Sequence, residues 1–347
     1  MKSRLRYLLY MLRIRRVEFR VAEIPILLIP ILLLIRETSV LKTFYFWEGI
    51  FLFFLLFAFG DMINCLADRD LDAVYKPHLS AAVYGLGVGF VTFQVVAAAA
   101  LALILSVHLA WRLNRWLLVP LVAIGLMLGA AYSVPPIRLK GRGLAQLFCL
   151  WLIIFVGPMW LVSMLIGNWP SGQLLVFAAA YGGLQMGVIL VNTAEDYPED
   201  LEANIKTTIV SLGLHRGIGL AFWLTALGVV GSIGVLGIVF WQRRVGEFWW
   251  LLLFPAVVTC LYVLTEILRL KLSIARVDLA ASIKTVKQTA RKVPLWLTLV
   301  AWSMAIAAWG VFMNGNRAGT HASGVLAGED ACVPTRSLPL PVLTSKR

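Results

Sequence analysis

The stretch FYFWEGIFLFFLLFAFGDMINCLADRDLD, residues 44–72, joins an apolar segment to a run of acids. Apart from two acids, residues 44–63 are apolar or small, and about 20 such residues are enough for a helix to cross a bilayer. The run that follows places Asn64, Asp68 and Asp72 at intervals of four residues. This combination predicts a membrane helix whose end carries an amide and two carboxylates on one face.

The composition of the whole chain is that of a membrane protein. Of its 347 residues, 60% are hydrophobic and 14% are charged, whereas a soluble domain carries about 25% charge. This difference excludes an ordinary soluble enzyme, a disordered protein and a nucleic-acid-binding module. The net charge of +13 therefore indicates basic loops facing an anionic membrane surface. The four cysteines are scattered, which argues against a disulfide framework or a zinc site.

Nine segments of the chain are apolar enough to be membrane spans, although the first of them is short. They cover residues 21–35, 44–63, 82–107, 116–132, 145–166, 174–192, 217–241, 248–268 and 294–313. We therefore expect an all-α, polytopic membrane protein with nine transmembrane helices.

The remaining segments suggest three parts of the chain. Residues 1–20 form a basic arm, residues 21–313 the transmembrane domain, and residues 314–347 a Gly, Pro, Ser and Thr-rich tail that we expect to be disordered. Within the domain, residues 269–292 are basic and amphipathic. They form either a helix on the inner membrane surface or a plain loop.

The distribution of basic residues predicts the orientation. With nine spans and the N-terminus inside, 21 of the 31 Lys and Arg residues fall on the inner side and 10 on the outer side. Because inner loops carry the excess of Lys and Arg, this asymmetry favours a cytoplasmic N-terminus and a C-terminus on the opposite side.

The acidic residues gather in two matching windows. The sequence NTAEDYPEDLE, residues 192–202, repeats the pattern N-x-x-x-D-x-x-x-D of residues 64–72, and the two windows hold eight of the 18 acids. Each lies at the inner end of an apolar span, so both face the same compartment. Pro198 predicts a helix break near Asp196, with Asp200 on a loop.

Oxygen ligands of this kind suit Mg²⁺, which typically combines one or two carboxylates with water and phosphate oxygens. Two facing clusters would hold Mg²⁺ on either side of a diphosphate. The alternative is a solvated acidic helix end or a helix cap. Two copies on one side of the membrane favour the functional reading, because carboxylates at the membrane edge are functional by default.

Basic residues predicted beside the acidic windows form a second group. The sequence YSVPPIRLK, residues 132–140, ends the fourth span, and its two prolines stop the helix next to Arg138 and Lys140. Lys76 follows the first window and Lys206 the second. These cations would grip phosphate groups that the metal also binds. Alternatively, they are ordinary positive charges of inner loops.

Three further polar residues have open roles. Asp61, inside the second span, would orient or deprotonate an acceptor, extend the metal cluster, or pair with a basic residue. Glu23, in the first span near Arg20, either faces a cavity or forms a salt bridge. His78 is either an acceptor contact or an ordinary interfacial histidine.

These motifs resemble those of the UbiA superfamily of intramembrane prenyltransferases, over residues 15–313. The paired Asp-rich windows, the continuation DLEANIKTT after Asp200 and the count of nine spans carry the resemblance, and YSVPPIRLK is similar to a loop of its chlorophyll-synthase branch. The resemblance implies helices around a central cavity that opens to lipid. It also implies that two Mg²⁺ ions and the diphosphate are held by Asn64, Asp68, Asp72, Asp196 and Asp200, with Asn192, Tyr132, Arg138, Lys140 and Lys206 as diphosphate contacts; Lys76 is a further contact expected from its place after the first window.

Two departures from the family pattern concern the acceptor. The family's Asn-Arg-Pro after the first motif is replaced by residues 75–77, Tyr-Lys-Pro, and the Arg-Pro of the first helix is replaced by residues 20–25, RVAEIP. These changes lie where acceptor and phosphate contacts are expected. They leave the expected fold unchanged and leave the acceptor open.

The expected function is Mg²⁺-dependent transfer of an isoprenoid from a prenyl diphosphate to an aromatic or other lipophilic acceptor within the bilayer. Metal and cations neutralise the diphosphate as it leaves, and a dry cavity protects the allylic carbocation. The same apparatus would serve a terpene cyclase, or a lipid or phosphoribosyl transferase. A transporter is the more remote alternative, because its polar residues usually lie near the midplane. No nucleic acid and no obligate protein partner is expected.

Overall fold

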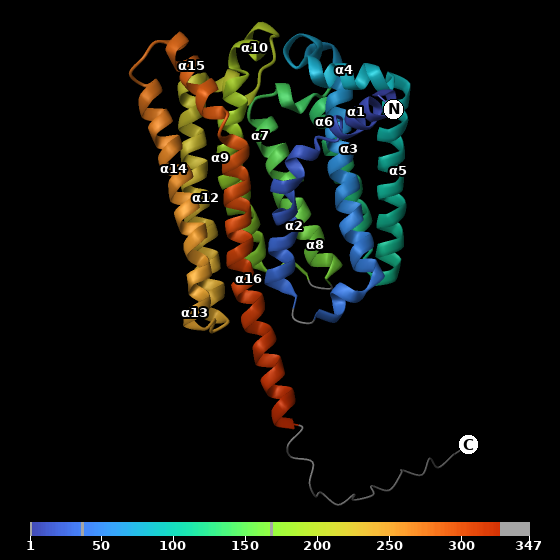
Figure 1. Cartoon of the computed structure of the whole chain (residues 1–347), viewed down its shortest axis with the longest axis vertical. Helices are drawn as coiled ribbons and strands as arrows, with labels where there is room; N and C mark the ends of the chain where they lie inside the picture. The colour runs from blue at the N-terminus through green and yellow to red at the C-terminus, as the bar shows by residue number, and fades with distance from the viewer. Residues whose placement is uncertain (1, 36–37, 167–168, 327–347) are drawn as a thin grey trace, which may run out of the picture.

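The structure is a computed structural model that describes residues 2–35, 38–166 and 169–326. In this part of the chain the secondary structure is helical, apart from loops and one isolated β-bridge between Arg142 and Lys206. The long helices run side by side as a bundle, with short helices across one end (Figure 1). The predicted all-α class is confirmed.

The helices of the first half extend to α8. They are α1 (Lys2–Arg13), η1 (Val17–Phe19), α2 (Arg20–Leu34), η2 (Thr38–Lys42), α3 (Phe44–Tyr75), α4 (Pro77–Leu86), α5 (Val88–Leu113), α6 (Leu118–Ser133), η3 (Leu139–Gly141), α7 (Leu144–Leu150), the π-helical η4 (Trp151–Val156) and α8 (Gly157–Leu165).

The helices of the second half begin with α9. They are α9 (Gly172–Glu195), α10 (Tyr197–Glu202), α11 (Thr208–Leu212), α12 (Leu214–Gln242), α13 (Glu247–Trp250), η5 (Leu251–Leu253), α14 (Phe254–Ile274), α15 (Leu279–Ala290) and α16 (Val293–Leu326).

Eight of the nine predicted spans coincide with a helix or an unbroken run of helices, and the remaining one, 82–107, covers parts of two. Within the described residues, seven of these are long and apolar enough to cross a membrane. The other two are shorter, since α2 has 15 residues and α6 has 16. Nine is therefore an approximate count. The predicted stop at Pro135-Pro136 is correct, because α6 ends at Ser133.

Three predicted boundaries differ from the structure. The predicted span 82–107 is divided at Gly87, whose φ of +92° separates α4 from α5. The disordered tail was predicted to begin too early, because residues 314–326, which contain no proline, continue α16; residues 327–347 lie outside the described part. Residues 279–290 form α15, which packs on α9 and α14, so a helix replaces the alternative of a plain loop.

Two apolar cores flank the middle of the bundle. One is built largely from α9, α12, α14 and α16, and the other from α3, α5, α6 and α8. The helix α2 contributes to both, with Ile29 in the first core and Leu27 in the second. The two acidic windows thus belong to different halves of the molecule, one on α3 and the other after α9.

The helices α9 and α12 approach each other backbone to backbone at two glycines. A Cβ atom at Gly228 would lie 2.3 Å from the Leu184 nitrogen, and one at Gly187 would lie 2.5 Å from the Ala221 carbonyl oxygen. Both distances are far shorter than van der Waals contact, so only glycine permits this packing. The close pairing fixes the position of α9, which carries the second acidic window.

We expect Gly228→Ala to destabilise the folded protein by about 1–3 kcal/mol, the usual effect of overpacking. Thermal unfolding of the purified protein in detergent would show a lower midpoint. Gly219→Ala, on the same helix, is the matched control, because no atom lies within 4 Å of its added Cβ. Equal midpoints for the two variants would contradict the close packing of α9 on α12.

Candidate functional site

A cavity of about 640 Å³ lies between the two halves of the bundle. Its wall combines residues of α2, α3, α6, the run from α7 to α8, α9 and the start of α16. Ten of the twelve predicted site residues line it: Asp61, Asn64, Asp68, Asp72, Lys76, Tyr132, Lys140, Asn192, Asp196 and Asp200. The two acidic windows, 128 residues apart in the sequence, therefore face one space.

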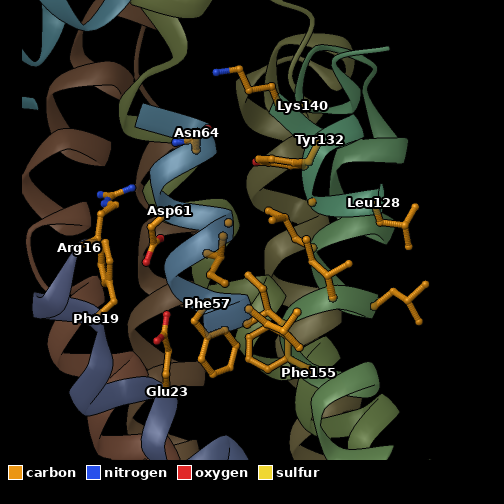
Figure 2. A pocket seen from close by; sticks show the side chains of 18 of the residues that line it. Arg16, Phe19, Glu23, Phe57, Asp61, Asn64, Leu128, Tyr132, Lys140 and Phe155 are labelled. Atoms are coloured by element: carbon orange, nitrogen blue, oxygen red, sulfur yellow. The ribbon is translucent and has the colours of Figure 1, made fainter. Parts of the chain in front are cut away.

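The first acidic window lies on α3, which continues without a break to Tyr75. Because the helix is continuous, residues four apart share a face, as predicted. Asp68 and Asp72 are 6% and 8% exposed. Figure 2 shows Asn64 and Asp61 along the same helix, with Tyr132 and Lys140 on the opposite wall.

The second acidic window spans the junction between two helices, α9 and α10. The helix α9 ends at Glu195, and Asp196 caps it, so the predicted break near Asp196 is correct. The prediction that Asp200 hangs from a loop is wrong: it lies on α10, and its N–H donates to the Asp196 carbonyl at 2.8 Å. Pro198 stands in the first turn of α10, where a helix tolerates proline because the missing N–H has no partner there.

Cations reach both windows. The Arg138 guanidinium donates to Asp68 at 3.1 Å, and Lys140 pairs with the other oxygen of that carboxylate. Lys76 donates to Asp196 at 2.9 Å, so the lysine that follows the first window holds the second. The Lys76–Asp196 contact ties the two halves together at the end of the cavity where the acids lie, while Arg138 and Lys140 join the segment after α6 to α3 within the first half.

Burial shifts the titration of the groups at this end. Burial and the neighbouring Asp196 raise the pKa of Asp200 to about 6, although a hydrogen bond from Thr207 opposes them. Burial also lowers the pKa of Lys140. For Lys76, burial lowers the pKa, but the ion pair with Asp196 outweighs it and the pKa is raised.

The donor set at this end fits a hard divalent cation. In the part of the chain that the structure describes, no three acidic, His or Cys side chains gather closely enough to hold a metal by themselves. However, the cavity brings four aspartates and two asparagines to one end. Mg²⁺ needs only one or two carboxylates when water and phosphate oxygens complete its shell. Asp72 and Asp200, which have no basic partner closer than 4 Å among the described residues, are available for this purpose.

Two predicted residues do not line the cavity. Arg138 is absent from the wall, although it contacts Asp68. The Lys206 side chain is exposed, and its backbone carbonyl accepts the Gly143 N–H at 2.7 Å, so the structure does not bring its ammonium to the acids. His78, left open above, is exposed and also lies outside the cavity wall.

The structure settles the partners of Asp61 and Glu23. Both pair with Arg20, and both also line the cavity. Asp61 therefore pairs with a basic residue, which was one of its predicted roles. Glu23 both forms a salt bridge and faces the cavity, so its two predicted alternatives hold at once.

Sequence reasoning missed five polar residues of the cavity wall: Arg16, Gln146, Gln185, Thr193 and Thr207. Gln146 accepts the Thr208 N–H at 2.8 Å and so joins α7 to the segment after the second window. For Gln185, a lone amide within an apolar span was the available signal. Arg16 had no distinguishing pattern among the basic residues of the N-terminal arm.

Comparison with known proteins gives relatives of the same kind. A 2-carboxy-1,4-naphthoquinone phytyltransferase of Synechocystis sp. is 30% identical over 37% of this chain and 42% of its own length. A homogentisate phytyltransferase of Synechocystis sp. is 26% identical over 52% and 66%, respectively. The chain thus spans less than two thirds of the length of either relative.

Solved structures show the same fold. A UbiA homolog from Archaeoglobus fulgidus bound to DMAPP and Mg²⁺ superposes with a TM-score of 0.57 at 17% identity, over 84% of this chain and 98% of that one. The sequence model of the UbiA prenyltransferase family matches residues 24–273. With its apolar helices, the protein is an integral, multi-pass membrane protein. The chain belongs to the UbiA prenyltransferase family.

Proposed function

We propose that this protein is a Mg²⁺-dependent intramembrane prenyltransferase that moves an isoprenoid group from a prenyl diphosphate to a lipophilic acceptor. The observation that carries the proposal is the convergence of both acidic windows and Lys76 and Lys140 on one end of an otherwise apolar cavity. The names of the relatives, which are phytyltransferases, and the DMAPP and Mg²⁺ of the A. fulgidus homologue agree with it.

In this proposal, Asn64, Asp68, Asp72, Asp196 and Asp200 hold Mg²⁺, with Asn192 beside the diphosphate. Bound Mg²⁺ neutralises charge on the leaving diphosphate. Lys140 and Arg138, which pair with Asp68, would supply further positive charge to the phosphate oxygens as the C–O bond breaks. Two metal ions, one for each acidic window, would match the two-sided arrangement.

The rest of the cavity protects the reacting carbon. Beyond the acidic end, the wall is formed largely by aliphatic and aromatic side chains, among them Phe57 and Phe155 (Figure 2). An apolar wall accommodates the isoprenoid chain and excludes water, which would otherwise capture an allylic carbocation. The proton released on transfer leaves with the diphosphate or through a polar group of the wall.

The orientation follows from the positions of the basic segments. The helices α1, α4, α10 and α15 lie at the same end of the bundle (Figure 1). This end contains both acidic windows and the basic segments 2–20 and 269–292. We propose that it faces the cytoplasm, because the positive-inside rule places such segments there.

The direct test of the proposed function is binding of geranyl diphosphate to the purified protein. We expect tight binding in the presence of Mg²⁺ and a loss of at least tenfold in affinity when EDTA removes the metal. Calorimetric titration in detergent would measure both. Equal affinity with and without Mg²⁺ would contradict the assignment of the acidic windows.

The raised pKa of Asp200 predicts a pH dependence of metal binding. An Asp with a pKa of about 6 is mostly ionised at pH 7 and mostly protonated at pH 5. Because Mg²⁺ binds the carboxylate, its affinity should fall about tenfold between pH 7 and pH 5, whereas an ordinary Asp would lose little above pH 5. Thr207→Val removes the hydrogen bond that lowers this pKa, so the decline should move to higher pH. A pH-independent affinity above pH 5 would contradict the prediction.

A further inference from the structure

One side of the first helix, α1, is attached to the helical bundle. Tyr10 packs on α4 so closely that a Cβ atom at Gly85 would lie 2.3 Å from its ring. Ile14, directly after the helix, is fully buried. Figure 1 shows α1 beside α4, at the end of the bundle that also carries α10 and α15. The position of α1 on the bundle is therefore fixed by its own packing.

The other side of α1 is a row of leucines that points away from the protein. The four leucines follow one another at intervals of three, one and three residues, so they share one face of the helix. Their side chains are 42–61% exposed: Leu5, Leu8, Leu9 and Leu12. A contiguous apolar face of this kind marks a surface that meets a membrane or a partner. We call these four residues the leucine face.

Arginines border the leucine face on both flanks. Arg6 and Arg13, seven residues apart, lie along one flank, and Arg4 lies along the other. All three side chains are exposed, and none has a partner among the described residues. The helix contains no acidic residue. The leucine face thus lies between positive charges that nothing in the described part of the chain balances.

The second basic segment of the same end, residues 269–292, differs in this respect. There Lys287 donates to Glu199 at 3.1 Å, and Lys292 donates to Glu266 at 2.7 Å. Part of the charge of this segment is therefore balanced by the protein itself. Of the two basic segments, α1 is the better candidate for binding an external anion.

The depth of α1 matches the boundary between lipid headgroups and acyl chains. The helix α5 has 26 residues, or about 39 Å, and exceeds a hydrocarbon core of about 30 Å, so its first turns reach the headgroup region. There the Tyr7 ring lies 6.1 Å from the Phe90 ring, and Arg15, just after α1, donates to Gln94 at 2.6 Å. Both contacts hold α1 beside the start of α5.

We propose that α1 is a docking surface for anionic phospholipids of the adjacent leaflet. The leucine face enters the acyl-chain region, and Arg4, Arg6 and Arg13 bind the phosphate groups on either side of it. Amphipathic helices with basic flanks lie in this plane, and their binding depends on anionic lipid. This surface lies outside the cavity wall, so the inference does not depend on the proposed catalysis.

Native mass spectrometry of the full-length protein tests the preference for anionic lipid. We would titrate the protein in micelles with palmitoyl-oleoyl phosphatidylglycerol or phosphatidylcholine, which share their acyl chains and differ in net charge. We expect the first phosphatidylglycerol to bind at least tenfold more tightly than phosphatidylcholine. Equal affinities would overturn the proposal.

Two triple variants locate the effect. Arg4→Gln/Arg6→Gln/Arg13→Gln should reduce the preference for phosphatidylglycerol at least fivefold, with an unchanged thermal midpoint as evidence of folding. The matched control removes three exposed cations from the other basic segment and should keep the preference within twofold: Arg276→Gln/Lys284→Gln/Arg291→Gln. An equal loss in both variants would show that net charge alone is responsible, and no loss in the first would show that lipid binds elsewhere. Either result would contradict the proposal.

Cysteine labelling tests whether the leucine face enters the lipid. Cys65, Cys149 and Cys260 are buried, so a Cys332→Ser background leaves an introduced cysteine as the main target of a water-soluble maleimide. In nanodiscs that contain phosphatidylglycerol, Leu8→Cys should react at least tenfold more slowly than Gln288→Cys, an exposed position of α15. Equal rates would place the leucine face in water. Oxidative cross-linking of Leu8→Cys between two chains would show that a second copy covers this face, and would also overturn the proposal.

Discussion

Replacing Asp68 with alanine should reduce Mg²⁺-dependent diphosphate release from a prenyl diphosphate at least about 1000-fold, and Asp196→Ala should have the same effect. Each aspartate lines the cavity, and each belongs to a different acidic window. Since the metal contributes several kcal/mol to neutralising the leaving group, and 1.4 kcal/mol is a factor of ten in rate, losing a ligand from either window removes most of the acceleration.

The control for Asp68→Ala lies two residues away in the same window. The Asp70 side chain is 70% exposed, lies near Arg69 at 3.4 Å and does not line the cavity. Asp70→Ala should therefore retain activity within about threefold, as surface changes outside the site usually do. A colorimetric assay of released diphosphate in detergent measures all three variants. Unchanged release in Asp68→Ala or Asp196→Ala would contradict the metal-site assignment.

Replacing Lys140 with methionine should lower the rate of diphosphate release by about 100- to 1000-fold, the usual effect of removing one preorganised donor from a developing charge. The Lys140 side chain is only 12% exposed, pairs with Asp68 and lines the cavity. Methionine keeps an unbranched side chain that is only one atom shorter and removes the ammonium, so that the loss reports mainly on charge. Binding of Mg²⁺ should weaken less than the rate, because Lys140 acts on the phosphate and not on the metal.

The matched control is Arg142→Met in the same basic loop. Arg142 is exposed, donates to the Pro136 carbonyl at 3.0 Å and does not line the cavity. Its replacement should leave the rate within about threefold of the wild type. An equal loss in both variants would mean that the loop acts only through its overall positive charge, and would contradict a specific role for Lys140.

The features that could be predicted from the sequence depend on local patterns. A continuous apolar run ending in acids at intervals of four is sufficient to define α3 and the face that carries Asn64, Asp68 and Asp72, because helix geometry is regular. The pair of prolines at 135–136 ends α6 for an equally local reason. Lys140 lies only four residues after these prolines, so its position near the acidic end of the cavity could also be predicted.

The features that could not be predicted depend on contacts between distant segments. The side chain of Lys206 is kept from the cavity because its backbone pairs with the segment at residues 142–143, a contact across more than 60 residues. The pairing of Lys76 with Asp196 joins the two halves in the same way. A proline can end one helix or stand in the first turn of the next. Pro198 does the latter in α10, and this depends on the direction in which the chain turns after α9.

Asp61 illustrates both cases. Its place in an apolar span marked it as functional, which is a local inference. Its partner Arg20 lies 41 residues earlier, and only the packing of α2 near α3 brings them together. The sequence therefore identified the carboxylate but left its partner open among several alternatives.

The most direct test of the central claim is mass spectrometry of membranes with and without the protein, supplied with prenyl diphosphates of increasing length. We expect a prenylated lipophilic product that requires Mg²⁺ and disappears in Asp68→Ala membranes. Its mass would identify the prenyl chain and the acceptor. Solute flux in liposomes with no diphosphate release and no prenylated product would contradict the account and favour a transporter.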